Sequence, residues 1–450
     1  MEKNNQLRPL FHITGEKGWI NDPNGLIFYN GKYHVFFQYY PHANHWGPMH
    51  WGHVTSKDLL HWERAPIALY PKNDTNEDGC FSGTAIIHNN ILFVVYTGFY
   101  ENGGGENIRQ LQCLASSIDG IYFQKHGVII GEKELPNEYS ACDFRDPKIW
   151  KENDTFYMLV AARKKEGRGH ILLFKSNDIF SWEFVSDVLE EESLGIMIEC
   201  PDYIKNLNLL MYCEQFQPSE GNYHLNIHSC RYLNGCLDLE KGKFIEDHRG
   251  IVDYGFDFYA PQVFANDNIL IGWLNMWDRN NPSEKYGFAG TLTIPRRVSV
   301  IDGKLIQKPI WNYSNACQKN IVKSYKDSLK YGAIKLTIKN LSELNIKLRK
   351  KEDQFFEVNL CENELIFDRS KSGEKIIGVE TDNDSINGIR RMPLFDKEDV
   401  EIEIISDEFS LEIFVNGLSA SFLLYPDEDS NGFELKIVSD KCVLTKSIFK

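Results

Sequence analysis

The sequence lacks several features that mark whole classes of protein. It contains no run of about 20 apolar residues, so we expect no helical membrane span. The N-terminal segment MEKNNQLRPLFHITGEKGW has no apolar core and no cleavage site, so we expect no signal peptide and a cytoplasmic location. The ten cysteines include no CxxC pair, which disfavours a zinc site, and we expect reduced thiols.

A basic surface is also missing. The formal net charge is −15, which disfavours nucleic acid and anionic membranes as partners. Hydrophobic residues make up 42 % of the chain and charged residues 25 %, as in ordinary globular proteins. Aromatic residues make up 13 %, which suits a strand-rich fold and stacking against sugar rings. These values leave the oligomeric state open.

A unit of about 60 residues recurs before residue 310. Each copy opens with a short polar motif, continues through an Asn-containing turn that favours a tight hairpin, and ends in an apolar strand. The copies begin at Asp22, Ser82, Asp146, Pro201 and Ala260. A second pair of strands follows, marked by a recurring S-x-D-x-x-x-aromatic pattern. Four strands in each of five units predict an all-β, five-bladed β-propeller over residues 1–309, with a β-sandwich or two barrels as the alternative.

The periodicity changes after residue 309. We interpret residues 310–322 as a linker and residues 323–450 as a C-terminal β-sandwich, because strands such as AIKLTIKN and EIEIISDEFSLEIFVNG alternate between apolar and polar side chains. This region shows no cluster of catalytic residue types. It serves either as a structural domain or as a carbohydrate-binding module, and we favour the structural role.

Equivalent positions in the blades of a propeller converge on its axis. We therefore expect the opening motifs to surround one funnel, with Asp22, Ser82, Asp146, Glu199 with Asp202, and Tyr259 at its wall. Three of these motifs are acidic: WINDPNG, FRDP and ECPD. Glycoside hydrolysis requires two carboxyl groups beside the scissile bond, and a third can hold sugar hydroxyls. A single Asp-Pro could be turn chemistry, but three acids in phase with the blades favour a catalytic site.

The neighbours of the acids suggest how each is tuned. Arg145 lies beside Asp146, and we expect its guanidinium to keep that carboxylate ionised. Glu199 is flanked by Ile198 and Cys200 without a nearby cation in the sequence. An apolar setting would raise its pKa, as an acid catalyst requires. We expect no metal and no organic cofactor.

The three motifs resemble those of glycoside hydrolase family 32, which contains invertases, fructanases and sucrose-6-phosphate hydrolases. The resemblance covers essentially the whole chain. It implies Asp22 as nucleophile, Glu199 as acid/base and Asp146 as stabiliser of the transition state. It also implies a substrate-binding set of Asn21, Gln38, Trp46, Phe81, Ser82, Arg145, Tyr259 and Trp277. Trp46 could instead belong to the core, Phe81 and Ser82 could be an ordinary blade start, and Trp273 competes with Trp277.

The implied activity is that of a retaining β-fructofuranosidase acting on a small carbohydrate, sucrose or sucrose-6-phosphate. A phosphate would need a basic pocket, for which Arg109, Arg279 and Lys285 are candidates. The alternatives are a fructan or fructo-oligosaccharide hydrolase, a fructosyltransferase, an inverting arabinan- or xylan-active propeller enzyme, and a catalytically silent sugar-binding protein. The chain departs from the family pattern at Arg297 and at Leu418-Ser419, which leaves the packing between the two domains open.

Overall fold

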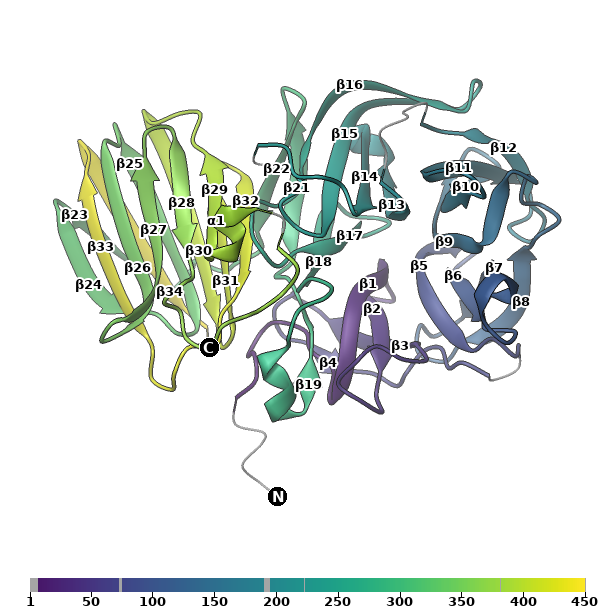
Figure 1. Ribbon diagram of the computed structural model, residues 1–450, viewed down its shortest axis with the longest axis horizontal. Coiled ribbons are helices and arrows are strands. Elements are labelled where there is room, and N and C mark those ends of the chain that lie inside the picture. The colour runs from purple at the N-terminus through teal and green to yellow at the C-terminus, as the bar shows by residue number, and fades with distance from the viewer. Residues whose placement is uncertain (1–6, 73–74, 190–194, 222, 381, 450) are drawn as a thin grey trace.

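The structure is a computed structural model, and it describes residues 7–72, 75–189, 195–221, 223–380 and 382–449. Two strand-rich regions lie side by side (Figure 1). Residues 1–6 and 450, which the predicted domains include at their ends, lie outside the described residues. In the described part of the chain, no helix has the length and apolar character needed to cross a membrane.

Five sheets follow one another in the N-terminal region, and their first strands face a common centre (Figure 1). The first two sheets contain β1 (Gly18–Tyr29), β2 (Lys32–Tyr40), β3 (His50–Ser56), β4 (Glu63–Arg64), β5 (Gly79–His88), β6 (Ile91–Tyr100), β7 (Arg109–Ser117) and β8 (Gln124–Ile130). The next two contain β9 (Tyr139–Glu152), β10 (Thr155–Lys164), β11 (Gly169–Ser176), β12 (Glu183–Asp187), β13 (Ile198–Ile204), β14 (Leu209–Gln215), β15 (His228–Asp238) and β16 (Lys243–Ile251).

The fifth sheet contains β17 (Tyr259–Val263), β18 (Ile269–Leu274), β20 (Thr291–Leu292), β21 (Arg296–Ile301) and β22 (Lys304–Pro309). Between β18 and β20, strand β19 (Phe288–Ala289) leaves this sheet and pairs in parallel with the start of β1. The last sheet is thereby tied to the first, which closes the ring.

Local sequence explains the hairpins of these sheets. Asn30, Asn89 and Asn153 occupy the turns with φ of 48°, 50° and 53°, a left-handed conformation that Asn tolerates. The Ser-x-Asp pattern forms a second kind of turn after the third strand. At its first copy, Ser56 Oγ accepts from Leu59 N at 2.8 Å and Asp58 Oδ1 accepts from His61 N at 2.8 Å.

The C-terminal region consists of two six-stranded sheets with an apolar core between them. One sheet contains β23 (Cys317–Ile321), β34 (Lys441–Ile448), β25 (Gly332–Lys339), β30 (Asp399–Asp407), β31 (Ser410–Val415) and β32 (Leu418–Leu423). The other contains β24 (Ser324–Ser328), β33 (Gly432–Val438), β26 (Glu343–Lys351), β27 (Gln354–Cys361), β28 (Glu364–Asp368) and β29 (Ile389–Pro393), the last preceded by α1 (Asn383–Ile386).

The segment expected to be the linker contains one strand. Strand β23 lies inside residues 310–322 and pairs with β34. Four of its five residues are exposed, so its sequence shows no apolar alternation that would have revealed a strand. The outer limits of the two domains stay a prediction.

Buried charges join the two regions. Arg296 of the propeller is fully buried and pairs with Asp253 at 3.0 Å and with Glu412 of the sandwich. His12 lies between Glu412 and Asp407, 2.8 Å from each. The two departures from the family pattern are accommodated here. Ser419 Oγ accepts from Arg296 at 3.1 Å, whereas Arg297 points outward and pairs with Asp267.

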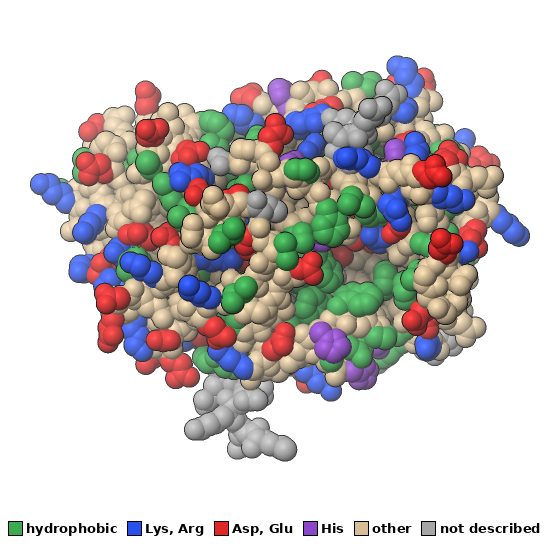
Figure 2. Space-filling model, viewed as in Figure 1, with side chains coloured by type: hydrophobic (Ala, Val, Ile, Leu, Met, Phe, Trp, Pro, Cys, Tyr) green, Lys and Arg blue, Asp and Glu red, His purple; other side chains and the backbone are tan. Residues whose placement is uncertain are grey.

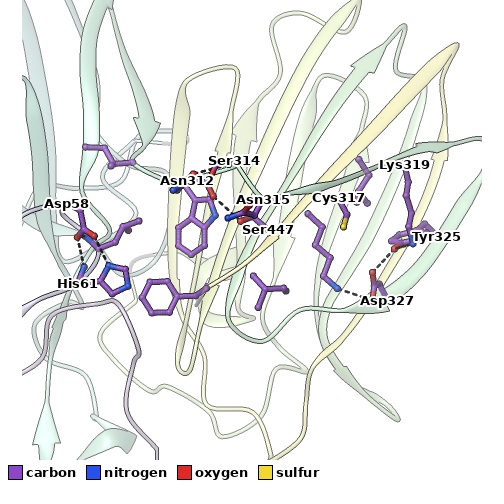
Figure 3. Close-up of a pocket in the computed structure, with 17 residues that line it drawn as sticks. Asp58, His61, Asn312, Ser314, Asn315, Cys317, Lys319, Tyr325, Asp327 and Ser447 are labelled. Carbon is purple, nitrogen blue, oxygen red and sulfur yellow. Dashed lines mark hydrogen bonds and ion pairs between the residues drawn. The ribbon is translucent and has the colours of Figure 1, made fainter.

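A groove of about 670 Å³ runs along this junction (Figure 3). Asp58 and His61 of the propeller form one end, and Tyr325 and Asp327 of the sandwich form the other (Figure 3). Trp311 and Phe449 supply apolar surface between them. The groove contains none of the predicted site residues.

Candidate active site

The first strand of every propeller sheet breaks register at the motif that the sequence repeats. Two residues of this strand face one residue of the next strand, which is a β-bulge. The bulges lie between Ile20 and Pro23, Cys80 and Gly83, Arg145 and Lys148, Glu199 and Asp202, and Tyr259 and Gln262. Bulges redirect side chains and are common beside active sites. Figure 2 shows hydrophobic side chains gathered over this part of the propeller face.

Three of the five bulges contain a non-glycine residue in the left-handed region. These are Asp146 with φ of 64°, Cys200 with φ of 52° and Ala260 with φ of 47°. Each precedes a proline. Such a conformation costs roughly 1–3 kcal/mol per residue and is found where the surrounding structure holds it for function. The strain lies at two of the three acidic motifs, FRDP and ECPD, and at the bulge of the fifth blade.

Asp22 is buried and its carboxylate is held by neighbours from two blades. Ser82 Oγ donates to Oδ2 at 2.6 Å, and Asn21 Nδ2 donates to Oδ1 at 2.9 Å. Trp19 Nε1 in turn donates to Asn21 Oδ1 at 2.8 Å, which orients that amide. Burial raises the pKa of Asp22 and these hydrogen bonds offset only part of the rise.

Asp146 is held mainly through backbone groups. Its Oδ2 accepts from Cys200 N at 2.9 Å, and its own N donates to Thr97 Oγ1 at 2.9 Å. Burial and the negative charge of Glu199 raise the pKa of Asp146, against the opposing charge of Arg145. Cys200 Sγ lies 3.6 Å from both Asp146 Oδ2 and Asp22 Oδ2, so one thiol contacts both acids.

Glu199 has a polar environment, which corrects the expectation of an apolar one. Arg145 Nε donates to Glu199 Oε1 at 3.0 Å, and Tyr259 Oη donates to Oε2 at 2.5 Å. Burial alone would raise the pKa of Glu199, but the charge of Arg145 and the bond from Tyr259 outweigh it, so the pKa is lowered. The guanidinium of Arg145 is therefore directed to Glu199, and it acts on the adjacent Asp146 through its charge.

Family models and known proteins match this chain over nearly its full length. The model of the glycosyl hydrolases family 32 N-terminal domain matches residues 12–309, and the model of the family 32 C-terminal domain matches residues 304–448. The chain belongs to glycoside hydrolase family 32. It is a glycoside hydrolase, and the predicted combination of a β-propeller with a β-sandwich is confirmed.

Three relatives illustrate the match. A sucrose-6-phosphate hydrolase of Zymomonas mobilis is 37 % identical over 94 % of this chain and 88 % of its own length. A raffinose invertase of Escherichia coli is 34 % identical over 98 % of this chain and 94 % of its own. The solved structure of a sucrose-6-phosphate hydrolase from Lactobacillus gasseri superposes with a TM-score of 0.89 at 27 % identity, covering 100 % of this chain and 94 % of that one.

The remaining predicted residues of this family 32 site differ in their environment. Gln38 is buried and donates to Cys80 O at 3.0 Å. Trp46 is 44 % exposed, which argues against a core role, and it meets the ring of Phe81 edge-on. Trp277 is partly buried and stacks on Trp19, whereas Trp273 is fully buried. Trp277 is thus the more exposed of the two indoles.

The predicted phosphate-binding cations are engaged in other pairs. Arg279 is buried against Asp257 and Glu380. Lys285 pairs with Glu374 of the sandwich at 2.5 Å, and Arg109 pairs with Glu132 at 2.6 Å. Their sequence positions carried no information on these partners, which lie in distant strands and loops.

Several residues beside the acids escaped the sequence reasoning. Trp19 orients Asn21, Thr97 accepts from Asp146 N, and Gln110 Oε1 accepts from Arg145 at 3.2 Å. His228 is buried near Glu199, and its charge when protonated would lower the pKa of that acid. Thr97 and Gln110 lie on second and third strands, where the blade repeat gives no motif. Trp19 lies within the quoted motif WINDPNG, so its position was a usable signal.

Proposed function

We propose that the protein is a retaining β-fructofuranosidase that hydrolyses sucrose or sucrose-6-phosphate, a small carbohydrate, in the cytoplasm. The observation that carries the proposal is the pair of differently tuned carboxyls at the axis. Asp22 is fixed by Ser82 and Asn21, while Glu199 is bound to Arg145 and Tyr259. The names of the relatives supply the substrate class.

In the first step, Asp22 attacks the anomeric carbon of the fructosyl unit and Glu199 protonates the leaving oxygen. A buried group of three carboxyls with one guanidinium favours retention of a proton, because like charges in a dry site raise one another's pKa. The pKa of Asp146 is raised and that of Glu199 is lowered, so we assign the proton to the interacting group of acids rather than to one residue. Glu199 is the member that would deliver it.

In the second step, Glu199 removes a proton from water, which attacks the fructosyl ester of Asp22. Ester formation removes the negative charge of Asp22, so the pKa of Glu199 falls and the group can act as a base. Asp146, held by Cys200 N and Thr97, would accept hydrogen bonds from hydroxyl groups of the fructosyl ring and stabilise the positively charged transition state. The configuration is retained after two inversions.

The test is release of reducing sugar from sucrose and from sucrose-6-phosphate, measured side by side with Asp22→Ala as blank. Cleavage of either sugar that disappears in the variant supports the proposal. A much higher kcat/KM on the phosphorylated sugar identifies a sucrose-6-phosphate hydrolase, and equal or better cleavage of sucrose identifies an invertase. Cleavage of neither overturns the proposal and directs the assay to fructans and to the inverting alternative.

A further inference from the structure

A second set of polar side chains follows the bulges on four of the five innermost strands, within two residues of the bulge. Its members are Thr84 on β5, Lys148 on β9, Asp202 on β13 and Gln262 on β17. Their exposed fractions are 5 %, 5 %, 1 % and 9 %. Lys148, Asp202 and Gln262 occupy equivalent places, and Thr84 lies one residue further along its strand. Buried polar groups need partners, because an unpaired one is destabilising by roughly 1–3 kcal/mol.

Each of these side chains finds a partner in another blade. Thr84 Oγ1 donates to Pro147 O at 2.9 Å and accepts from Ile149 N at 3.0 Å, which joins the second blade to the third. Lys148 forms an ion pair with Asp202, which joins the third blade to the fourth. Asp202 Oδ2 accepts from Val263 N at 2.5 Å, which joins the fourth to the fifth.

Gln262 closes the ring. Its Nε2 donates to Gly83 O of the second blade at 3.1 Å, and its Oε1 accepts from Leu26 N of the first blade at 3.1 Å. The path from blade two through three, four and five therefore returns to blade two, with blade one attached. Ser82 and Asp22 provide a further link between the first two blades.

We propose that Asp202, together with Lys148, is a positioning pair that fixes the bulges of Asp146, Glu199 and Tyr259 relative to one another. Lys148 lies two residues after Asp146, Asp202 lies three after Glu199, and Val263 lies four after Tyr259. The inference rests on the hydrolase activity proposed above. A displacement of about 1 Å between catalytic groups can lower a rate by about 100-fold, so a rigid link at this place has a direct effect on kcat.

The charges of Lys148 and Asp202 should also affect the pH dependence of catalysis. A buried ion pair is often no more stabilising than apolar residues of the same size, so its presence here suggests a role other than stability. Neutralising one partner leaves the other charge uncompensated, on Asp202 three residues after Glu199 or on Lys148 two residues after Asp146. That acid faces Asp22 from β1, Glu199 and the Cys200 thiol from β13, and Arg145 from its own strand. An added charge changes the titration of this whole cluster.

The two single variants should therefore move the pH profile in opposite directions. Asp202→Asn leaves Lys148 positive, which favours ionised carboxylates and lowers their pKa values. Its kcat/KM profile should move to lower pH. Lys148→Met leaves Asp202 negative, which raises the pKa values, and its profile should move to higher pH. Residues with a purely structural role would not move the pH profile in opposite directions when each is replaced.

The experiment measures kcat and KM on the better of the two sugars from about pH 4 to about pH 9 for wild type, Asp202→Asn, Lys148→Met and the double variant. Thr84→Val is the matched neutral control, because it breaks the same ring without changing a charge. Lys148→Arg keeps the charge and guards against a variant that fails to fold. All values are normalised to the folded fraction measured by thermal melting.

We expect both single variants to lose about 10- to 100-fold in kcat with KM nearly unchanged, and the double variant to return to the wild-type profile position. Lys148→Arg should stay near wild type, and Thr84→Val should lower kcat without moving the profile. Unchanged kcat in the folded single variants, or profiles that coincide or move together, would overturn the proposal. If wild type cleaves neither sugar, the proposed function fails instead. The positioning pair is then tested by a ¹³C NMR titration of the carboxyl groups, in which the two single variants should shift the pKa values in opposite directions.

Discussion

Strand β25 of the sandwich and strand β9 of the propeller are both antiparallel strands, yet they pair with their neighbours in different ways. β25 keeps unbroken register with β30 and β34 along its whole length. β9 breaks register at Asp146 and buries Asp146 and Lys148 beside it. Regular pairing with an apolar core favours stability, whereas the broken strand gives up ladder bonds to aim charged side chains at the axis.

The sandwich contains an instructive exception. In its described strands, register breaks only in β26, where Arg349 has a φ of 52°. The Arg349 side chain donates to Asp407 O at 2.6 Å and to Ser430 O at 2.7 Å. Asp407 is also a partner of His12 from the propeller. A bulge thus accompanies a charge with a specific task even in the sandwich.

The largest effect is expected at the propeller axis. Asp22→Asn should lose on the order of 10⁴-fold or more in kcat, because it removes the attacking group while leaving the shape of the site unchanged. The change in melting temperature should be small. Steady-state kinetics on sucrose provide the measurement, with Asp267→Asn, in the turn between β17 and β18, as a matched control. Turnover near wild type in Asp22→Asn would contradict the nucleophile assignment.

A smaller effect is expected from Tyr259→Phe. The variant loses the hydrogen bond that Tyr259 donates to Glu199, which favours the ionised form of that acid, so the pKa of Glu199 rises. We expect about a tenfold lower kcat and an alkaline limb of the kcat/KM profile that moves to higher pH. A limb that stays in place or moves to lower pH would show that this bond does not tune the acid.

The junction should respond in stability rather than in turnover. Burial lowers the pKa of His12, but its bonds to Asp407 and Glu412 outweigh this and raise the pKa to about 9. Because the folded pKa lies above the unfolded value, the stabilisation is complete below about pH 6.5 and is lost as pH rises through 9. The unfolding free energy of wild type should fall by about 3 kcal/mol over this interval.

His12→Gln tests that pH dependence. Its unfolding free energy, measured by denaturant titration at several pH values, should lose the fall between about pH 6.5 and about pH 9. His45→Gln, in an exposed loop, is the matched control and should keep the wild-type curve. An unchanged pH dependence in His12→Gln would show that His12 is neutral in the folded protein.

The smallest effect is expected in the core of the sandwich. Ile404 on β30 is fully buried among apolar neighbours. Ile404→Val should destabilise the protein by about 1 kcal/mol in denaturant unfolding. Its kcat on sucrose, normalised to the folded fraction, should equal that of wild type. A lowered kcat would mean that packing in the sandwich reaches the axis, and it would erase the contrast between the two regions.

The sequence predicted the architecture well because the blade repeat combines turn chemistry with strand alternation. The sequence was less exact about which residues of the five blades occupy equivalent positions. The bulges align Asn21, Phe81, Asp146, Cys200 and Ala260 as equivalent positions, so Asp22 and Glu199 lie one residue to either side of the position of Asp146. The repeat in the sequence cannot reveal this offset, because a bulge changes the strand pairing without changing the pattern of apolar and polar residues.

The environment of Glu199 could not be predicted from the sequence either. Its cation, Arg145, lies 54 residues away in the sequence and reaches it from the neighbouring blade. The ring formed by Thr84, Lys148, Asp202 and Gln262 has the same origin, since each partner belongs to another blade. Contacts between blades depend on the closure of the propeller, and no local spacing encodes them.

The most direct test of the account is the stereochemistry of fructosyl transfer. Wild-type enzyme is incubated with sucrose in dilute methanol, and the methyl fructofuranoside that forms first is identified by NMR. Attack by Asp22 followed by attack of methanol predicts the β-anomer, because two inversions retain the configuration. The α-anomer would show a single displacement, and it would contradict the roles given to Asp22 and Glu199.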